Sequence, residues 1–353
     1  MPKTALAIAA SLLAASSLAA QERPRFNPDG SVEVPAFNLP PSVYLSPEAL
    51  AAQKDRAKPS VGAPPTMVDI ATSRARLEAG LAPQVARMRE VYPADVAEAR
   101  MGGVRVRVVT PKDKPFNRKR VLINLHGGAF SVCAEACAML ESVPISALGG
   151  FKVVTVDYRM APEHRHPAGV EDVAAVYREL LKTYKPLHIG IYGCSAGGAL
   201  TGHAGAWLPA QGLPRPGALG IFGAGAVRFG AGDSSWIAAA IDGSFPAPAR
   251  AGQPEMDMTR GYFTGSDMAG PDVSPALHPE VLRQFPPTLV ITGTRAMDMS
   301  PAIVTNSALL KAGVRSTLIV AEGMGHCFIY QPDLPESRDA HQAIVSFFRE
   351  TLR

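Results

Sequence analysis

The chain has 353 residues, of which 47% are hydrophobic and 19% are charged, a balance that supports one large hydrophobic core or two smaller ones. Its net charge is +4 and no long basic run is present, so the composition gives no sign of a nucleic-acid-binding surface.

The first residues, 1–20, have the pattern of a secretory signal. Lys3 precedes an apolar run from Ala5 to Ala20 that ends in small residues. The run is shorter than the roughly 20 residues of a membrane span. We therefore expect a cleaved signal peptide and an exported protein, periplasmic or secreted, without an integral membrane span. A buried or disordered N-terminal helix is the alternative.

The next segment, residues 21–66, is rich in proline, with nine prolines between Gln21 and Pro65. This composition predicts an extended N-terminal arm rather than a folded domain. Helical spacing of apolar residues begins near Met67, and we expect helices over 67–100.

From residue 101 onward, short β-branched runs alternate with amphipathic, helix-like segments. This alternation predicts an α/β fold with a mainly parallel central sheet, whose functional residues collect at the carboxyl ends of the strands. Residues 228–270 do not follow this alternation, and we interpret them as an insertion. The predicted strands are 104–109, 121–125, 152–156, 188–192, 218–222, 288–292 and 317–321.

A candidate nucleophile follows the predicted strand 188–192. Gly193, Ser195 and Gly197 form a G-x-S-x-G pattern, and a helix-like segment comes next. A catalytic serine needs a strained strand-to-helix turn with small neighbours. The pattern therefore favours Ser195 as a nucleophile over a glycine-rich turn that contains an incidental serine.

Candidate oxyanion donors follow the predicted strand 121–125, in the stretch HGGAF. Backbone N–H groups of Gly127, Gly128 and Ala129, together with that of Ala196, are positioned after strands as an oxyanion hole requires. Ala129 keeps its N–H, so the hole survives unless this position needs a positive φ. An ordinary tight turn is the alternative.

The base and the acid are expected after Ser195 in the chain. Of the later histidines, His326 follows a predicted strand in a glycine-flanked loop, whereas the others lie in helices or a proline-flanked loop; these are His203, His278 and His341. Among nine intervening carboxylates, only Asp298 and Glu322 follow a predicted strand. Glu322 is four residues from His326, so Asp298 is the better partner, with Glu322 as the alternative.

The four cysteines form no zinc-ligand pattern. Cys133 and Cys137 could pair only if their segment is not helical, because helical spacing of four holds Cβ atoms too far apart. Cys194 and Cys327 each adjoin a proposed catalytic residue. We interpret them as two small buried thiols, with a redox-sensitive pair as the alternative.

These motifs resemble the hormone-sensitive-lipase-like (bacterial family IV) esterases, a branch of the α/β-hydrolase fold. The similarity runs from about Arg120 to the C-terminus. Three departures stand out: Ala129 replaces a glycine, Cys194 replaces an aspartate, and Asp298 comes two residues later than the family's acid. The motifs that carry the resemblance are HGGAF, DYRMAPEHRHPA, GCSAGG, SPALHPEVLRQFPPTLV and EGMGHCF.

The resemblance implies a catalytic domain over 101–353 with a helical cap, built from helices in 67–100 and the insertion at about 228–270. It implies a serine carboxylesterase that hydrolyses short-to-medium acyl esters through an acyl-enzyme, with a small-molecule ester as partner and neither metal nor organic cofactor. A non-catalytic ligand-binding protein on the same fold is an alternative, as is an amidase or peptidase with the same triad. The sequence does not indicate an oligomeric state.

Overall fold

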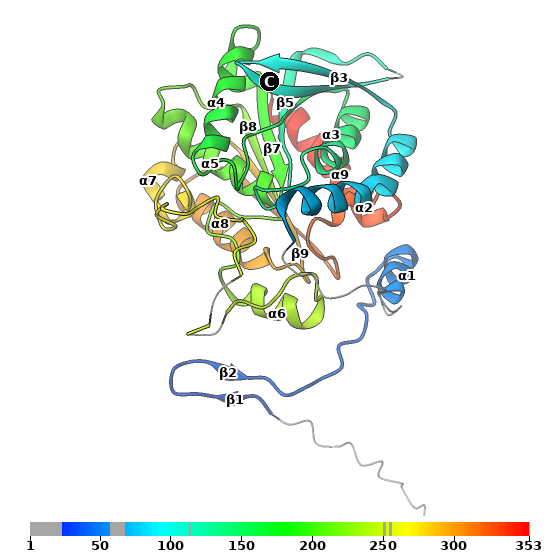
Figure 1. The fold of residues 1–353 in the computed structure, drawn as a ribbon, viewed down its shortest axis with the longest axis vertical. Coiled ribbons are helices and arrows are strands. Elements are labelled where there is room, and N and C mark those ends of the chain that lie inside the picture. The colour runs from blue at the N-terminus through cyan, green and yellow to red at the C-terminus, as the bar shows by residue number, and fades with distance from the viewer. Residues whose placement is uncertain (1–22, 57–67, 113, 250–251, 254–255, 353) are drawn as a thin grey trace, which may run out of the picture. The chain divides into compact units, whose positions relative to one another are not determined.

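The computed structural model describes residues 23–56, 68–112, 114–249, 252–253 and 256–352 (Figure 1). The predicted signal peptide, 1–20, lies outside these residues, as does the junction of the arm and the predicted helices, 57–67. The chain divides into two units, Met1–Pro40 and Pro41–Arg353. In the described part of the first unit, β1 (Arg25–Phe26) and β2 (Val32–Glu33) form an antiparallel hairpin.

The described part of the second unit holds an eight-stranded sheet with the order β10-β9-β8-β7-β5-β6-β4-β3. In this order, the neighbouring strands from β10 to β6 pair in parallel. The two antiparallel pairs of the sheet are β6–β4 and β4–β3. The prediction of a mainly parallel sheet is confirmed. The strands are β3 (Ala94–Met101), β4 (Val104–Pro111), β5 (Asn117–Leu125), β6 (Phe151–Val156), β7 (Ile189–Cys194), β8 (Ala218–Phe222), β9 (Thr288–Gly293) and β10 (Ser316–Ala321).

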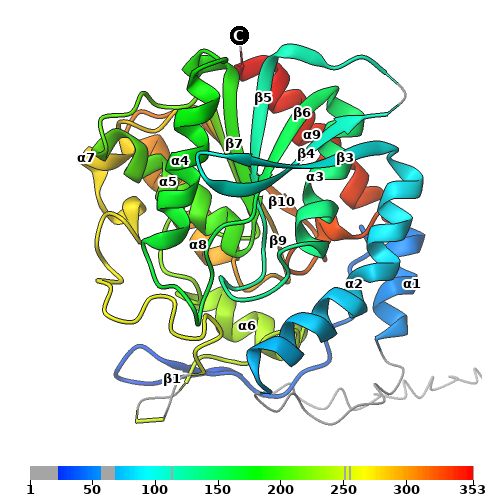
Figure 2. The same cartoon turned by 45° about the horizontal axis from the view of Figure 1, so that its top comes forward.

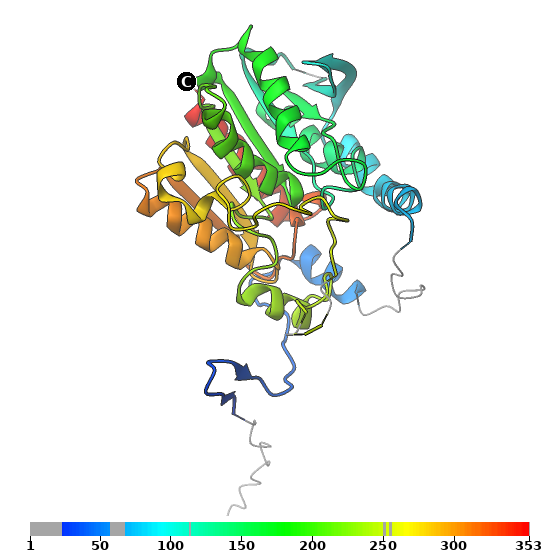
Figure 3. The same cartoon turned by 60° about the vertical axis from the view of Figure 1, so that its left-hand side comes forward.

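Alternate side chains of each strand point to opposite faces of the sheet. Helices cover both faces, because both carry apolar side chains. Within β5, Val121 and Ile123 join one hydrophobic cluster, while Leu122 between them joins the other. In Figure 3 the green α4 and α5 lie on one side of the sheet and the red α9 on the other. The helices are α1 (Pro47–Asp55), α2 (Ile70–Val91), α3 (Ala136–Gly149), α4 (Ala168–Leu181), α5 (Ala196–Ala210), α6 (Asp233–Ile241), α7 (Pro279–Leu282), α8 (Met299–Lys311) and α9 (Pro335–Thr351).

Two predicted segments differ from the structure at the level of elements. Residues 94–101, at the end of the predicted helical stretch 67–100, form β3, since the Gly102–Gly103 turn folds them back onto β4. The predicted extended arm, 21–66, contains α1, whose N-terminus is capped by Ser46 Oγ accepting the Ala49 N–H at 3.0 Å. The division into arm, cap and catalytic domain stays a prediction.

The insertion contributes α6 and a series of turns. Figures 1 and 2 show α6 beyond the carboxyl ends of the parallel strands, on the side where the candidate site residues lie. Hydrogen bonds between Ser234 and Ser300 join α6 to the start of α8. The insertion therefore covers this edge of the sheet.

Candidate active site

Ser195 occupies the turn between β7 and α5, with φ 59° and ψ −124°. L-residues rarely adopt this conformation, and strain of this kind is typical of functional turns. The flanking glycines are required sterically: a Cβ on Gly193 would lie 2.1 Å from the Leu125 carbonyl oxygen, and one on Gly197 only 1.7 Å from it. The G-x-S-x-G pattern therefore reflects how closely this turn passes the end of β5.

The structure brings Ser195 together with His326 and Asp298. His326 lies in the loop after β10, and its Nε2 is 2.9 Å from Ser195 Oγ. Its Nδ1 is 2.6 Å from Asp298 Oδ1. Since an ionised carboxylate only accepts hydrogen bonds, Nδ1 carries the proton and Nε2 is free to accept the serine hydroxyl. The side chain of His326 is 10% exposed and that of Asp298 is fully buried.

The acid of this arrangement is Asp298 and not Glu322, which is exposed on the surface. The turn of residues 294–297 separates Asp298 from the end of β9 and places it just before α8. Its second oxygen, Oδ2, accepts the Thr292 hydroxyl at 2.6 Å. Although Asp298 comes two residues later than the acid of the family, the turn lets it reach His326. Its contact with Thr292 was not found from the sequence.

The expected oxyanion donors divide into two groups. Gly127 donates its N–H to Glu141 Oε1 at 2.9 Å, so the expectation for this residue is wrong. Among the described residues, nothing accepts the N–H groups of Gly128 and Ala129, which follow in the same loop. Ala129 has a φ of 50°, so the position where an alanine replaces glycine does have the positive φ that was set as the condition against it. The alanine nevertheless adopts this left-handed backbone and keeps its N–H, at a cost in strain that a glycine would not have. Ala196 is the first residue of α5, where helix N–H groups have no partner within the helix.

Comparison with known proteins identifies the family of this chain. A family model described as the alpha/beta hydrolase fold matches residues 122–330. This chain belongs to the α/β hydrolases. It is 31% identical over 238 residues to an acetyl-hydrolase of Streptomyces hygroscopicus, covering 65% of this chain and 75% of that protein.

Solved structures extend the likeness to nearly the whole hydrolase. The crystal structure of esterase E25 is 27% identical, with a TM-score of 0.79, and covers 92% of this chain and 99% of that one. An esterase of the bacterial hormone-sensitive lipase family is 26% identical, with a TM-score of 0.74, and covers 87% and 97%. The predicted fold and the resemblance to this family are confirmed.

All four cysteines of the hydrolase are in disulfides, which corrects the expectation of free thiols at Cys194 and Cys327. Cys194 ends β7 and Cys327 follows His326, so the loops that bring Ser195 to His326 also bring these neighbours together. The absence of a side chain at Gly223 leaves space for this disulfide, since a Cβ there would lie 3.0 Å or less from both sulfur atoms.

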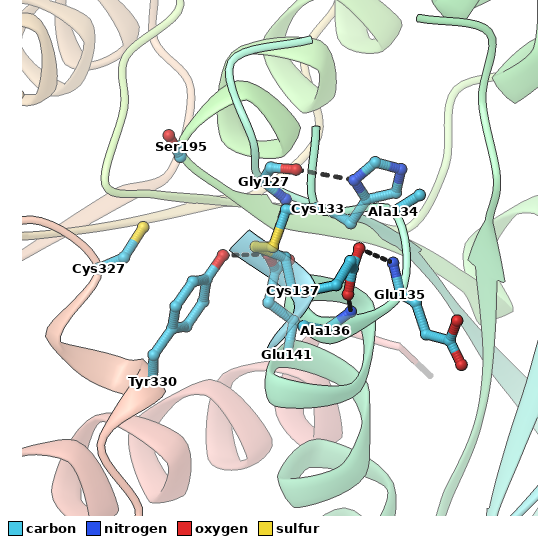
Figure 4. The surroundings of a disulfide bond; sticks show 12 residues. Gly127, Cys133, Ala134, Glu135, Ala136, Cys137, Glu141, Ser195, Cys327 and Tyr330 are labelled. Atoms are coloured by element: carbon cyan, nitrogen blue, oxygen red, sulfur yellow. Dashed lines mark hydrogen bonds between the residues drawn. A yellow bond between two sulfur atoms is a disulfide. The ribbon is translucent and has the colours of Figure 1, made fainter. Parts of the chain in front are cut away.

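The second bridge joins Cys133 to Cys137 (Figure 4). Cys133 precedes α3 and has a φ of 66°, so the segment between the two cysteines is not helical throughout. The two cysteines could pair only if their segment is not helical, and this condition is met.

An apolar cavity of about 430 Å³ opens beside Ser195. Along α5 its wall is formed by Ser195, Ala199 and His203, one helical turn apart. Burial lowers the pKa of His203 to about 3, so this imidazole is neutral. The insertion contributes Phe245, whose ring meets His326 edge-on at 5.0 Å between centroids. The sequence analysis did not find Phe245, because nothing in its local pattern relates it to the histidine loop.

The described residues contain no group of three or more histidine, cysteine or acidic side chains arranged to hold a metal ion. No described helix is long and apolar enough to cross a membrane.

Proposed function

We propose that this α/β hydrolase is a serine carboxylesterase that cleaves short-to-medium acyl esters through an acyl-enzyme on Ser195. The observation that carries the proposal is the unbroken hydrogen-bonded series Ser195–His326–Asp298 at the wall of an apolar cavity. The coarser statement, that the chain is a hydrolase acting on ester bonds, is confirmed by the acetyl-hydrolase and esterases that share its family.

In the proposed acylation step, Ser195 Oγ attacks the ester carbonyl carbon while His326 Nε2 takes the hydroxyl proton. Asp298 holds the Nδ1–H of His326, which fixes the tautomer and stabilises the imidazolium that forms. The tetrahedral intermediate collapses as the C–O bond of the ester breaks, and His326 returns the proton to the departing alcohol. Ser195 is left as the acyl ester.

The carbonyl oxygen gains negative charge in this step. The N–H groups of Gly128, Ala129 and Ala196 are proposed to receive it, and the N-terminus of α5 adds a favourable dipole. Loss of one such donor costs about 3–4 kcal/mol of transition-state stabilisation. Gly127 has no part in this role, since its N–H is held by Glu141.

In the proposed deacylation step, water attacks the acyl carbon and gives its proton to His326 Nε2. The second tetrahedral intermediate then releases the carboxylic acid and returns the proton to Ser195. Every proton moves between Oγ, Nε2 and the reacting groups, so the side chains described are sufficient for the cycle.

The first test is Ser195→Ala, which should abolish hydrolysis of p-nitrophenyl butyrate and labelling by a fluorophosphonate probe. Ser346→Ala on α9 is the matched control and should keep both. A panel of p-nitrophenyl esters from acetyl to decanoyl then gives the preferred acyl length. Labelling of the parent without turnover of any ester would favour an amidase or peptidase, and no labelling would favour a non-catalytic ligand-binding protein.

We further propose that the enzyme is exported. The pattern of residues 1–20 motivates this, and two disulfides within the described residues support it, because disulfides persist in oxidising compartments. Mass spectrometry of the secreted or periplasmic protein should find an N-terminus near Gln21; an intact Met1 in all material would contradict the proposal.

A further inference from the structure

Glu141 is a buried acid that the catalytic scheme does not use. It lies in the middle of α3, whose other residues over 136–147 are apolar or small, and only 2% of its surface is exposed. Burying an ionisable side chain is costly unless its hydrogen bonds are satisfied. The contacts of this carboxyl group therefore indicate what it does.

Four donors converge on the two oxygens of Glu141. Oε1 accepts the Gly127 N–H at 2.9 Å and the Tyr330 hydroxyl at 2.6 Å. Oε2 accepts the Asn124 amide at 2.8 Å and the Cys194 N–H at 3.1 Å. Each oxygen thus receives one backbone N–H and one side-chain donor.

These donors come from three separate parts of the active site. Gly127 begins the loop that carries Gly128 and Ala129, and Cys194 immediately precedes Ser195. Tyr330 lies in the short 3-10 helix Phe328–Tyr330, which follows the histidine loop. In Figure 4 the dashed line from Tyr330 leads to the Glu141 carboxylate.

No lysine or arginine among the described residues forms an ion pair with this carboxylate. Phenols surround it instead: Tyr330 donates to it, and Tyr192 donates to its main-chain oxygen at 3.1 Å. Burial raises the pKa of Glu141 to about 7, while the hydrogen bonds from Tyr330, Asn124, Gly127 and Cys194 act in the opposite direction. A protonated carboxyl would present its O–H to donors, so the surroundings match the ionised form.

We propose that Glu141 is a positioning residue for the reaction, whose carboxylate holds the oxyanion loop, the residue before Ser195 and the histidine loop in one arrangement. By fixing the Gly127 peptide it directs the following N–H groups toward the carbonyl oxygen. By holding Cys194 and Tyr330 it maintains the approach of Ser195 to His326. The inference rests on the proposed function.

Glu141→Gln is the decisive variant, because its amide has one oxygen and one NH2 group. Either orientation of the amide leaves a backbone N–H without an acceptor, that of Gly127 or that of Cys194. We expect kcat to fall about 10- to 100-fold, as for a small misplacement of reacting groups. KM should change little, and the thermal unfolding midpoint should fall by only a few degrees, because one buried backbone N–H loses its acceptor. Labelling by the fluorophosphonate probe should slow in parallel with kcat.

Two further variants complete the experiment. Glu179→Gln, on the exposed surface of α4, removes a charge without touching the site and should behave as the parent. Tyr330→Phe removes one of the four donors and should lower kcat less than Glu141→Gln does. If Glu141→Gln does not fold, Tyr330→Phe alone decides, and a parental kcat in that variant overturns the proposal.

A folded Glu141→Gln protein with kcat within twofold of the parent also overturns it. A fall in kcat that comes with a fall in the unfolding midpoint large enough to unfold part of the protein at the assay temperature would indicate a merely structural acid. This outcome would count against the assignment. A parent chain that neither hydrolyses esters nor reacts with the probe contradicts the proposed function itself, and this inference with it.

Discussion

At the scale of single residues, the two oxygens of Asp298 have different partners. Oδ1 meets His326 and Oδ2 accepts the Thr292 hydroxyl, so the carboxylate cannot rotate without losing a hydrogen bond. This fixed orientation suits an acid that must hold one tautomer of an imidazole.

Asp298→Asn should therefore lower kcat by about 10⁴-fold, since an amide can present its NH2 group to Nδ1 and stabilise the wrong tautomer. Steady-state kinetics with p-nitrophenyl butyrate, together with circular dichroism to verify the fold, would measure this. Glu322→Gln serves as the control and should match the parent. If the effects of the two variants were reversed, Glu322 would be the acid.

Individual site residues were predictable to different degrees. Ser195 and His326 follow strands in local patterns that reflect their chemistry, and Asp298 followed by elimination. Glu141 and Thr292 have no such pattern. An acid within an apolar helix reads as an irregularity until the structure places four donors around it.

At the scale of elements, the two disulfides differ in the length of chain they enclose. Cys133 and Cys137 are four residues apart, whereas Cys194 and Cys327 are 133 apart and join the end of β7 to the loop after β10. In the chain-entropy model, a loop of the longer kind contributes about 4–5 kcal/mol and the shorter one about 2 kcal/mol.

The double variant Cys194→Ser/Cys327→Ser should consequently lose more stability than Cys133→Ser/Cys137→Ser. Urea denaturation of the two variants and the parent gives the free energies of unfolding. We also expect kcat to fall in the first variant, because the bridge ties the neighbours of Ser195 and His326. A larger loss of stability in the second variant would contradict this ranking.

Element boundaries were harder to predict than element types. The seven predicted strands all appear, but β3 was assigned to a helical stretch, because ADVAEARM has no continuous apolar run. It forms a strand through pairing with β4, and only one of its eight side chains is buried. The pairing of Cys194 with Cys327 was likewise beyond local pattern, since it depends on two loops meeting across the sheet.

At the scale of the whole molecule, buried histidines make the fold sensitive to acid. Burial lowers the pKa of His126 and His341 to about 4 and that of His203 to about 3, from 6.5. The unfolded chain therefore takes up protons first as the pH falls below 6.5, so stability is lost from there down to about pH 4. Glu141 acts in the opposite sense, since its pKa is raised from 4.5 to about 7, and its contribution is lost as the pH rises through 7.

Because three histidines outweigh one acid, the free energy of unfolding should decrease from pH 6.5 to 4.5. His341→Phe should reduce this slope by up to about 1.4 kcal/mol per pH unit, the value for one proton. Denaturation at intervals of half a pH unit measures the slope in both proteins. An unchanged slope in the variant would show that His341 is not the group that titrates.

The active site is a product of the whole sheet. Ser195 and His326 are 131 residues apart in the chain, yet they meet because β7 and β10 run in the same direction and end at the same edge. The parallel direction of the strands could be anticipated from the alternating pattern, and with it the edge where the residues meet; the order of the strands could not. The resemblance implied that residues 228–270 contribute to a cap, but the positions of α6 and Phe245 could not be predicted, because these residues have no regular period.

The Cys194–Cys327 bridge also provides an analytical handle. Trypsin cuts after lysine and arginine but not before proline, so Ser195 falls within peptide 183–228 and His326 within peptide 316–338. Without reduction these two peptides stay joined. A single mass-spectrometric species therefore contains both the nucleophile and its base, and a covalent inhibitor, an acyl group or an oxidised histidine can be read from that one ion.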